Sequence, residues 1–486
     1  MYVIACGHGL TASAAKEIMD SGGNAFDGII AASFASTVVE PMLTTLAGGG
    51  IGLLHSPSGE TKAVDFLTNF PTAESPASAI KDVVSFRGEN QVFYLGYGSI
   101  GVPGTLDGLL HIHRNHCTME LDKLLAPAIR FAKGHKMSSF QEFVCYGVLK
   151  NFVSYTEGSR EVFLPHGRPI KEGEPIRNLK LAAFLEMLSS DENAAIGFYH
   201  EAVSKTLEGK QSSLSPDDLK SYKVFEREPI SIDYRSYNVS LAPPPSAGGL
   251  LIAHGLKFLE QRNPGHYQHN SYDHVELLIE MTKECDSRRT SGFFKNLLYK
   301  EGFWKQFLKK DNFGGTTHIS ITDSDGNAAT ITASNGQGCG VMAGDTGIML
   351  NNFAAEPDLM QYRELYTPGE RITSMMTPTV ITRDGKLSAV LGSGGSSRIR
   401  SAITQVISNM IDFNMEPQAA TNASRVHFEG DLLQLEPGID PEKLAGKYNC
   451  NVWKESNNFF FGGVHIAAMD KGGGDPRRSG TVVLGR

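Results

Sequence analysis

Cysteine is scarce and scattered in this sequence of 486 residues. The six cysteines form neither a CxxC pair nor a dense framework, which excludes a scaffold built on disulfides and favours a reduced compartment. The first residues also lack the basic stretch, the apolar core and the small-residue cleavage site of a signal peptide. We therefore expect a mature, cytoplasmic protein.

Long apolar runs and a surplus of basic residues are missing as well. The most apolar region, residues 26–54, is broken by Asp27, Glu40, Pro41 and three consecutive glycines, so it cannot supply the roughly 20 apolar residues of a membrane span. A formal net charge of -8 argues against the concentrated basic face that nucleic acid requires. We predict no membrane and no nucleic-acid partner, and expect a small molecule or a peptide.

The order of the predicted elements indicates a layered fold. Apolar residues at helical spacing predict two helices between Leu10 and Pro41, and the second is apolar almost throughout and therefore buried. Helices, then strands, then a helix on the sheet indicate an α/β (α+β) protein with α/β/β/α layers. The predicted helices are one within 99–116, several over much of 120–210, a short one from Ser215, one after the proline turn at 243–245, and one at 397–414. The predicted strands lie at 48–56, 61–70, in a hairpin around Asp325-Gly326-Asn327, and near 347–352, 377–393 and 482–486.

A Gly-Gly-Thr-Thr stretch at residues 314–317 opens the predicted hairpin. If the Gly315-Thr316 bond were cut, Thr316 would carry both a hydroxyl nucleophile and an α-amine whose unperturbed pKa of about 8 suits a general base. The preceding glycines give the chain room for the strained turn in which a hydroxyl attacks its own upstream carbonyl. On this spacing alone, the ordinary start of a hairpin is the simpler interpretation.

The wider sequence changes that balance. It contains, in this order, the stretches "GGNAFDGIIAASFASTVVEP", "AGGGIGLL", "GVPGTLDGLL", "SLSPDDLKSY", "APPPSAGGLLI", "TTHISITDSDGNAATITAS", "GIMLNN" and "GSGGSSRI". Together they resemble the γ-glutamyltranspeptidase family of N-terminal-nucleophile hydrolases over nearly the whole chain. The resemblance implies a four-layer αββα sandwich and autocleavage into a large subunit, 1–315, and a small subunit, 316–486, which form one intertwined unit. It also implies a threonine amidohydrolase or acyltransferase acting on γ-glutamyl amides such as glutathione, mainly by hydrolysis.

The resemblance also implies roles for individual residues. Thr316 matches the nucleophile, and Ser334 matches a second threonine that lies near the nucleophile's amine and keeps its hydroxyl here. Gly395 and Ser396 match the stretch whose backbone N–H groups form the oxyanion hole. Asn335 matches an asparagine that binds substrate, in a loop shorter than the family's.

Several positions depart from the family in the part that holds a free amino-acid head. The family's arginine in "DFRE", which pairs with the substrate α-carboxylate, is Leu67 here, so a bidentate charge pair is missing. Phe353 replaces a polar side chain. Glu356 stands about where the family has an aspartate that receives the α-amine, and it could still bind this amine. Only Ser374 remains of a serine pair, because Met375 follows it. Recognition of the amino-acid head should therefore be weaker.

Other functions stay open at this stage. Arg363 or Arg371 could supply the missing positive charge. The chain could act on glutaryl or other dicarboxylic-acyl amides, as relatives of the cephalosporin acylases do, or could be a scaffold that never cleaves and binds other molecules. A nucleotide-binding role for the glycine clusters is a third alternative. A homodimer is compatible with the family's fold, and nothing in the sequence fixes it.

The sequence predicts no metal and no cofactor. In "HIHRNHC", one face of a helix could present His113, His116 and Cys117 to a metal, but no second ligand cluster accompanies them. The glycines at 48–52 fail the dinucleotide fingerprint, because no helix follows at the required spacing and no acidic ribose partner is evident.

Overall fold

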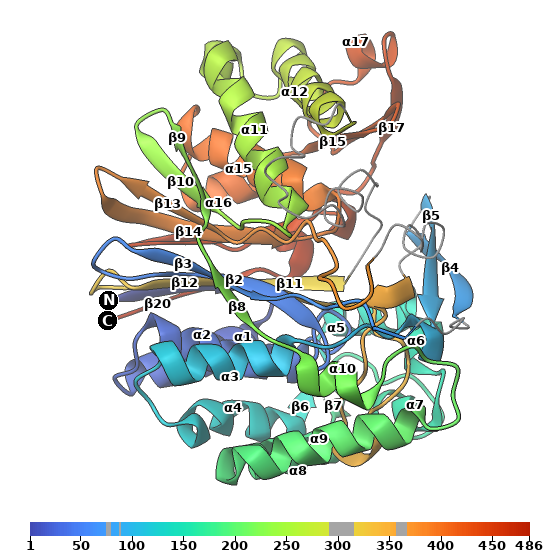
Figure 1. The fold of residues 1–486 in the computed structure, drawn as a ribbon. Coiled ribbons are helices and arrows are strands. Elements are labelled where there is room, and N and C mark those ends of the chain that lie inside the picture. The colour runs from blue at the N-terminus through green and yellow to red at the C-terminus, as the bar shows by residue number, and fades with distance from the viewer. Residues whose placement is uncertain (74–78, 87–88, 291–314, 356–366) are drawn as a thin grey trace.

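The computed structural model of the chain describes residues 1–73, 79–86, 89–290, 315–355 and 367–486. Two large antiparallel sheets pack face to face between two layers of helices (Figure 1). This arrangement confirms the predicted αββα sandwich. The first sheet contains, in spatial order, β20 (Thr481–Gly485), β1 (Tyr2–Cys6), β11 (Gly315–Asp323), β12 (Ala328–Gly336), β2 (Gly49–His55), β3 (Thr61–Phe66) and β8 (Phe225–Arg227). The second contains β19 (Gly472–Gly473), β18 (Gly463–Ala468), β14 (Lys386–Gly394), β13 (Thr379–Arg383), β10 (Tyr237–Leu241) and β9 (Ile230–Tyr234).

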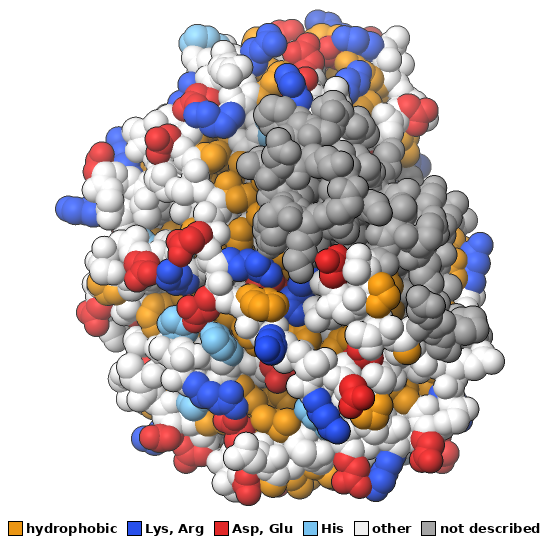
Figure 2. Space-filling view, in the orientation of Figure 1, with side chains coloured by type: hydrophobic (Ala, Val, Ile, Leu, Met, Phe, Trp, Pro, Cys, Tyr) orange, Lys and Arg blue, Asp and Glu red, His pale blue; other side chains and the backbone are white. Residues whose placement is uncertain are grey.

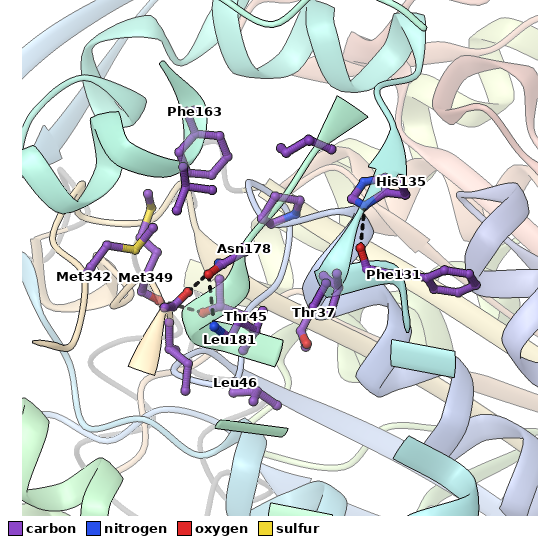
Figure 3. A pocket seen from close by; sticks show the side chains of 17 residues that line it. Thr37, Thr45, Leu46, Phe131, His135, Phe163, Asn178, Leu181, Met342 and Met349 are labelled. Atoms are coloured by element: carbon purple, nitrogen blue, oxygen red, sulfur yellow. Dashed lines mark hydrogen bonds between the residues drawn. The ribbon is translucent and has the colours of Figure 1, made fainter. Parts of the chain in front are cut away.

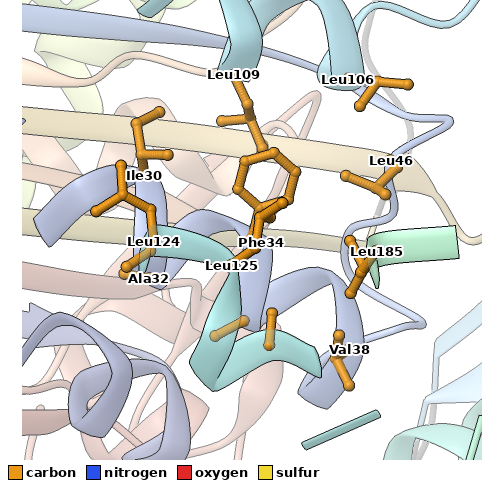
Figure 4. Close-up of a cluster of buried hydrophobic side chains, with 14 of the residues drawn as sticks. Ile30, Ala32, Phe34, Val38, Leu46, Leu106, Leu109, Leu124, Leu125 and Leu185 are labelled. Atoms are coloured by element: carbon orange, nitrogen blue, oxygen red, sulfur yellow. The ribbon is translucent and has the colours of Figure 1, made fainter. Parts of the chain in front are cut away.

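The helical layer on the first sheet is built around α2 (Ala25–Val39), in which every residue is buried. The side chain of Asn24 accepts hydrogen bonds from the first turn of α2, and Asp27 accepts one from the backbone N–H of Asn24, which fixes where the helix begins. Ile30, Phe34 and Val38 lie among leucines of the neighbouring helices (Figure 4). The helices packed on α2 are α1 (Gly9–Asp20), α3 (Thr105–His116) and α4 (Leu121–Lys133). Farther out, α8 (Leu179–Ser190) packs on α4, and α9 (Glu192–Leu207) packs on α8.

A second apolar core lies between the second sheet and the helices that cover it (Figure 1). These helices are α11 (Ala247–Arg262), α12 (Tyr272–Thr290), α15 (Arg398–Ile411) and α16 (Pro417–Asn422). The remaining elements are β4 (Ile80–Phe86), β5 (Glu89–Leu95), β6 (His135–Lys136), α5 (Ser139–Glu142), a π-helical turn at Phe143–Val148, α6 (Lys150–Val153), α7 (Glu157–Phe163), β7 (Pro175–Ile176), α10 (Pro216–Ser221), β15 (Val426–Glu429), β16 (Leu432–Leu435), α17 (Glu442–Ala445) and β17 (Asn449–Val452). The 3₁₀ turns are η1 (Tyr97–Ser99), η3 (Pro264–His266), η5 (Gly344–Thr346), η6 (Phe353–Ala355), η8 (Phe459–Phe461) and η9 (Pro476–Arg478).

One predicted strand is wrong. Residues 347–352 make only isolated bridges, Ala47 with Leu350 and Met342 with Met349. Gly347 adopts a left-handed φ of 69°, and the side chain of Asn351 binds the backbone of Ala47 and of Gly101, so regular pairing cannot extend. The basic stretch around Lys295 to Lys310 lies outside the described residues.

The surface shows no concentration of one charge over the described residues of the face in Figure 2, where acidic and basic side chains are interspersed. In the ranges that the structure describes, no helix has both the length and the apolarity needed to cross a membrane.

Candidate active site

Thr316 lies at the start of β11, in the middle of the first sheet and opposite Ser334 of β12. Alternate residues of β11 face opposite ways. Ile319 belongs to the core shared with α2, whereas the hydroxyl of Ser320 approaches a carbonyl of the second sheet, so Thr316 faces the second sheet. The register of the β11–β12 pair shifts between Gly315 and Thr316, at the bond predicted to be cut. Such irregularities are common beside active sites.

The carbonyl of Gly315 is held from the opposite strand. The hydroxyl of Ser334 donates a short hydrogen bond to this carbonyl and accepts one of 3.0 Å from the backbone N–H of Gly336. A side chain at position 315 would collide with the backbone oxygens of Met42 and Gly336, so only glycine fits. Because Ser334 polarises the carbonyl that would be attacked, its hydroxyl is placed to assist cleavage.

The predicted oxyanion turn lies against Thr316 from the other sheet. A Cβ at Gly394, the last residue of β14, would overlap the carbonyl oxygen of Thr316. Gly395 and Ser396 follow with φ values of 131° and 53°, both in the left-handed range, before α15 begins at Arg398. The two residues predicted to supply the N–H groups of an oxyanion hole therefore follow directly after the residue that contacts Thr316.

The predicted substrate-binding residues come from separate segments of the chain. Asn335 follows Ser334 and is buried; its Nδ2 donates to the carbonyl of Pro41 at 3.2 Å, while its Oδ1 has no hydrogen-bond partner among the described residues. Ser374 lies on a separate loop beside Ser246, and its hydroxyl accepts the backbone N–H of Met376. Glu356 and Arg363 lie outside the described residues.

The alternative that Arg371 replaces the missing arginine does not fit the structure. Its guanidinium is buried, with Nε 3.1 Å from Asp65 Oδ1 and further hydrogen bonds to Asn69 and to the carbonyl of Lys223. Leu67, at the family's arginine position, is 2% exposed and belongs to the second core. The guanidinium of Arg371 therefore links the segments that carry Asp65, Asn69 and Lys223, and is already engaged in hydrogen bonds within the protein.

Glu40, which directly follows α2, is a buried carboxylate that the sequence analysis missed. Its Oε1 accepts the Thr11 hydroxyl at 3.0 Å and its Oε2 accepts the Thr317 hydroxyl at 2.7 Å, which ties it to the residue after Thr316. Burial raises the pKa of Glu40 to about 7, although Thr317, Thr11 and the charge of Arg478 oppose the shift. The sequence signal was an acidic residue that ends an otherwise apolar helix.

We expect Glu40→Gln to change how stability depends on pH. The folded-state pKa is raised from 4.5 to about 7, so the native protein binds one more proton than the unfolded chain between these values. The wild type should therefore lose stability, of the order of 3 kcal/mol, as the pH rises through this window. Glutamine does not ionise, so the variant does not lose this stability. The melting temperature of the variant relative to that of the wild type should therefore rise between pH 4.5 and 7, and the difference should stay constant above pH 7. A difference in melting temperature between the two proteins that does not change with pH would contradict the raised pKa of Glu40.

In two other places the polar side chains are bonded to the protein itself. His113 binds the carbonyl of Met119 and the Cys117 thiol binds the carbonyl of Phe26; no group of three metal-ligating side chains occurs in the described part of the chain. Figure 3 shows a cavity lined mainly by apolar side chains, whose polar members Asn178 and His135 are bonded to the protein. None of the predicted site residues lines this cavity.

Known proteins resemble the chain over most of its length. The family model described as gamma-glutamyltranspeptidase matches residues 11–294 and 293–485. The glutathione hydrolase proenzyme of Escherichia coli (strain K12) is 32% identical over 482 residues, which cover 88% of this chain and 81% of that protein. The Acylase ACY 1 proenzyme of Pseudomonas sp. (strain V22) is 29% identical over 485 residues, which cover 91% and 85%.

A solved structure shares the fold. The cephalosporin acylase from Bacillus halodurans superposes with a TM-score of 0.83 at 23% identity, covering 100% of this chain and 96% of that one. The family model accounts for nearly every residue from 11 to 485, and the Escherichia coli relative is more than 30% identical over most of both chains. The chain belongs to the gamma-glutamyltranspeptidase family.

Proposed function

We propose that this protein is an autoprocessing threonine amidohydrolase with Thr316 as its nucleophile. The observation that supports this most directly is the hydrogen bond from Ser334 to the carbonyl of Gly315, at a register shift in β11. The backbone of the next residue, Thr316, lies against Gly394, which precedes the Gly395–Ser396 turn. An acyl shift requires a carbonyl polarised by a hydrogen-bond donor, a hydroxyl that can attack this carbonyl, and N–H donors for the oxyanion that forms.

Maturation would proceed in two steps. The Thr316 hydroxyl attacks the Gly315 carbonyl, the C–N bond breaks, and the acyl group moves from nitrogen to oxygen as an ester. Water then hydrolyses the ester, giving fragments 1–315 and 316–486. The fragments would stay together, because β1 and β2 of the first lie on either side of the β11–β12 pair of the second in one sheet.

Catalysis would use the new N-terminus. The free α-amine of Thr316 takes the proton of the hydroxyl as this attacks a substrate amide, and the oxyanion rests on the N–H groups of Gly395 and Ser396. The leaving amine departs with a proton, and an acyl ester forms on Thr316. Water attacks this ester, releases the acid and restores the hydroxyl and the amine.

The substrates that we propose are γ-glutamyl amides such as glutathione, cleaved mainly by hydrolysis. Relatives named glutathione hydrolase and acylase are both similar to this chain. Leu67 cannot pair with an α-carboxylate, and Phe353 packs with Phe70 and Ile372 where a polar side chain would hold the amino-acid head. These apolar residues favour glutaryl and similar dicarboxylic-acyl amides as the second candidate.

The test compares two anilides with the same leaving group. γ-Glutamyl-p-nitroanilide and glutaryl-p-nitroanilide differ only in the α-amino group of the acyl chain. We expect both to be hydrolysed once intact mass shows the two fragments, with KM for the γ-glutamyl compound in the millimolar range. A glutaryl preference above about tenfold in kcat/KM would establish the acylase alternative. An uncleaved chain that hydrolyses neither compound would establish the scaffold alternative.

A further inference from the structure

Arg478, at the end of η9, is a buried cation with few partners. It is 3% exposed, and its Nη1 donates to the carbonyl oxygen of Thr316 at 3.1 Å. Its Nε is buried and has no hydrogen-bond partner among the described residues, and its guanidinium lies 3.9 Å from the centroid of the Phe459 ring. Within the described ranges, Arg478 makes no salt bridge.

The two nearby arginines are bonded quite differently. Arg425 pairs with Asp475 at 2.5 Å, and Arg477 pairs with both Asp475 and Glu436. Buried charges are normally compensated in this way, because an unpaired one is costly. Among the residues that the structure describes, no carboxylate pairs with Arg478, and its positive charge is directed at the residue that the proposed function makes the nucleophile.

The geometry also places this charge beside the amine. In an extended strand the N–H and the C=O of one residue point to the same side. The carbonyl of Thr316 faces Arg478, so the nitrogen released by cleavage faces it too. We infer that Arg478 is a positioning residue that keeps the freed amino group of Thr316 neutral, and so able to accept a proton, by placing a like charge next to it. This inference depends on the proposed cleavage at Gly315-Thr316.

The other ionisable groups around Arg478 do not cancel this effect. Burial raises the pKa of Glu40 to about 7, so its negative charge is incomplete at neutral pH. Burial lowers the pKa of His465 to about 4, which leaves this ring neutral. Burial also lowers the pKa of Arg478, to about 9, so the guanidinium is still charged at neutral pH. Asp475 is shared between the other two arginines, and Arg425 adds a further positive charge.

The first experiment follows kcat/KM against pH for cleaved wild type, Arg478→Lys and Arg478→Met. Intact mass is recorded first, so that failure of cleavage in the wild type, which would overturn the proposed function, is separated from failure of this inference. We expect Arg478→Met to move the acidic limb of the pH profile to a higher pH by about one unit. Its kcat/KM should therefore fall roughly tenfold at pH values below the limb and change little above it. Arg478→Lys should restore the wild-type limb. An equal loss at every pH would show a merely structural role and overturn the inference.

A second measurement uses the wild type alone and does not depend on any variant folding. Cyanate carbamylates neutral amines, so the rate at which the Thr316 N-terminus gains mass reports the fraction that is unprotonated. We expect its midpoint to lie about one pH unit or more below that of a peptide beginning with the sequence from Thr316 to Thr322. A midpoint at or above that of the peptide would overturn the inference.

Discussion

Replacing Thr316 by alanine is expected to leave a single chain of 486 residues and to lower kcat by at least about 10⁴-fold. The variant keeps the backbone of β11, the Ser334 hydrogen bond and the Gly394 turn, but has no hydroxyl to attack the Gly315 carbonyl. Without cleavage the α-amine is never released, so one substitution removes both the nucleophile and its base. Intact mass under denaturing conditions, followed by an amidase assay, measures both losses.

The neighbouring threonine provides the matched control. Thr317 has the same side chain on the same strand, but it faces the helical layer and donates to Glu40. Thr317→Ala should still yield two fragments divided between Gly315 and Thr316, at some cost in stability because the buried carboxylate loses a partner. If Thr316→Ala were cut at this bond, or if Thr317→Ala alone blocked cutting, the nucleophile would be wrongly assigned.

The sequence predicts most of the features that depend on neighbours along the chain. The hairpin at 315–336 is recognisable because alternating residues flank an Asp-Gly-Asn turn, and α2 because its residues are apolar on every side. The failure at 347–352 has a local cause: two asparagine side chains there bind backbone groups, which a propensity for strands does not reveal. The layered fold then followed from the order of the elements.

The sequence could not show which distant residues meet. Glu40 and Thr317 are far apart in the chain and touch only because α2 ends beneath β11. Arg478 reaches Thr316 because the C-terminal segment returns beside β1, whose position next to β11 no local pattern encodes. The charges that surround the candidate nucleophile are therefore a product of sheet order, which the motif around Thr316 does not reveal.

Gly394→Ala is the second change from which we expect a large effect, because here the two sheets approach each other at the site. A Cβ at this position would overlap the carbonyl oxygen of Thr316 and would also lie 3.1 Å from Nη1 of Arg478. The overlapping groups, Gly394 and the carbonyl of Thr316, belong to the backbone of β14 and of β11, so the added methyl group can be accommodated only if the start of β11 moves. Since a misplacement of about 1 Å can cost 10²-fold, we expect self-cleavage to slow by about that factor. The appearance of the 316–486 fragment in freshly made protein measures the rate.

Gly197→Ala separates this effect from the general consequence of adding a methyl group. Gly197 lies within α9, where a Cβ would meet nothing within 4 Å. Alanine there should raise the stability of the helix by up to about 1 kcal/mol and leave the rate of cleavage unchanged. If Gly394→Ala matured as fast as the wild type, the carbonyl of Thr316 would not be held against β14, and neither Arg478 nor the Gly395–Ser396 turn could act on the nucleophile from the positions seen here. Slow maturation of Gly394→Ala beside normal maturation of Gly197→Ala would instead locate the requirement at the contact between β14 and β11.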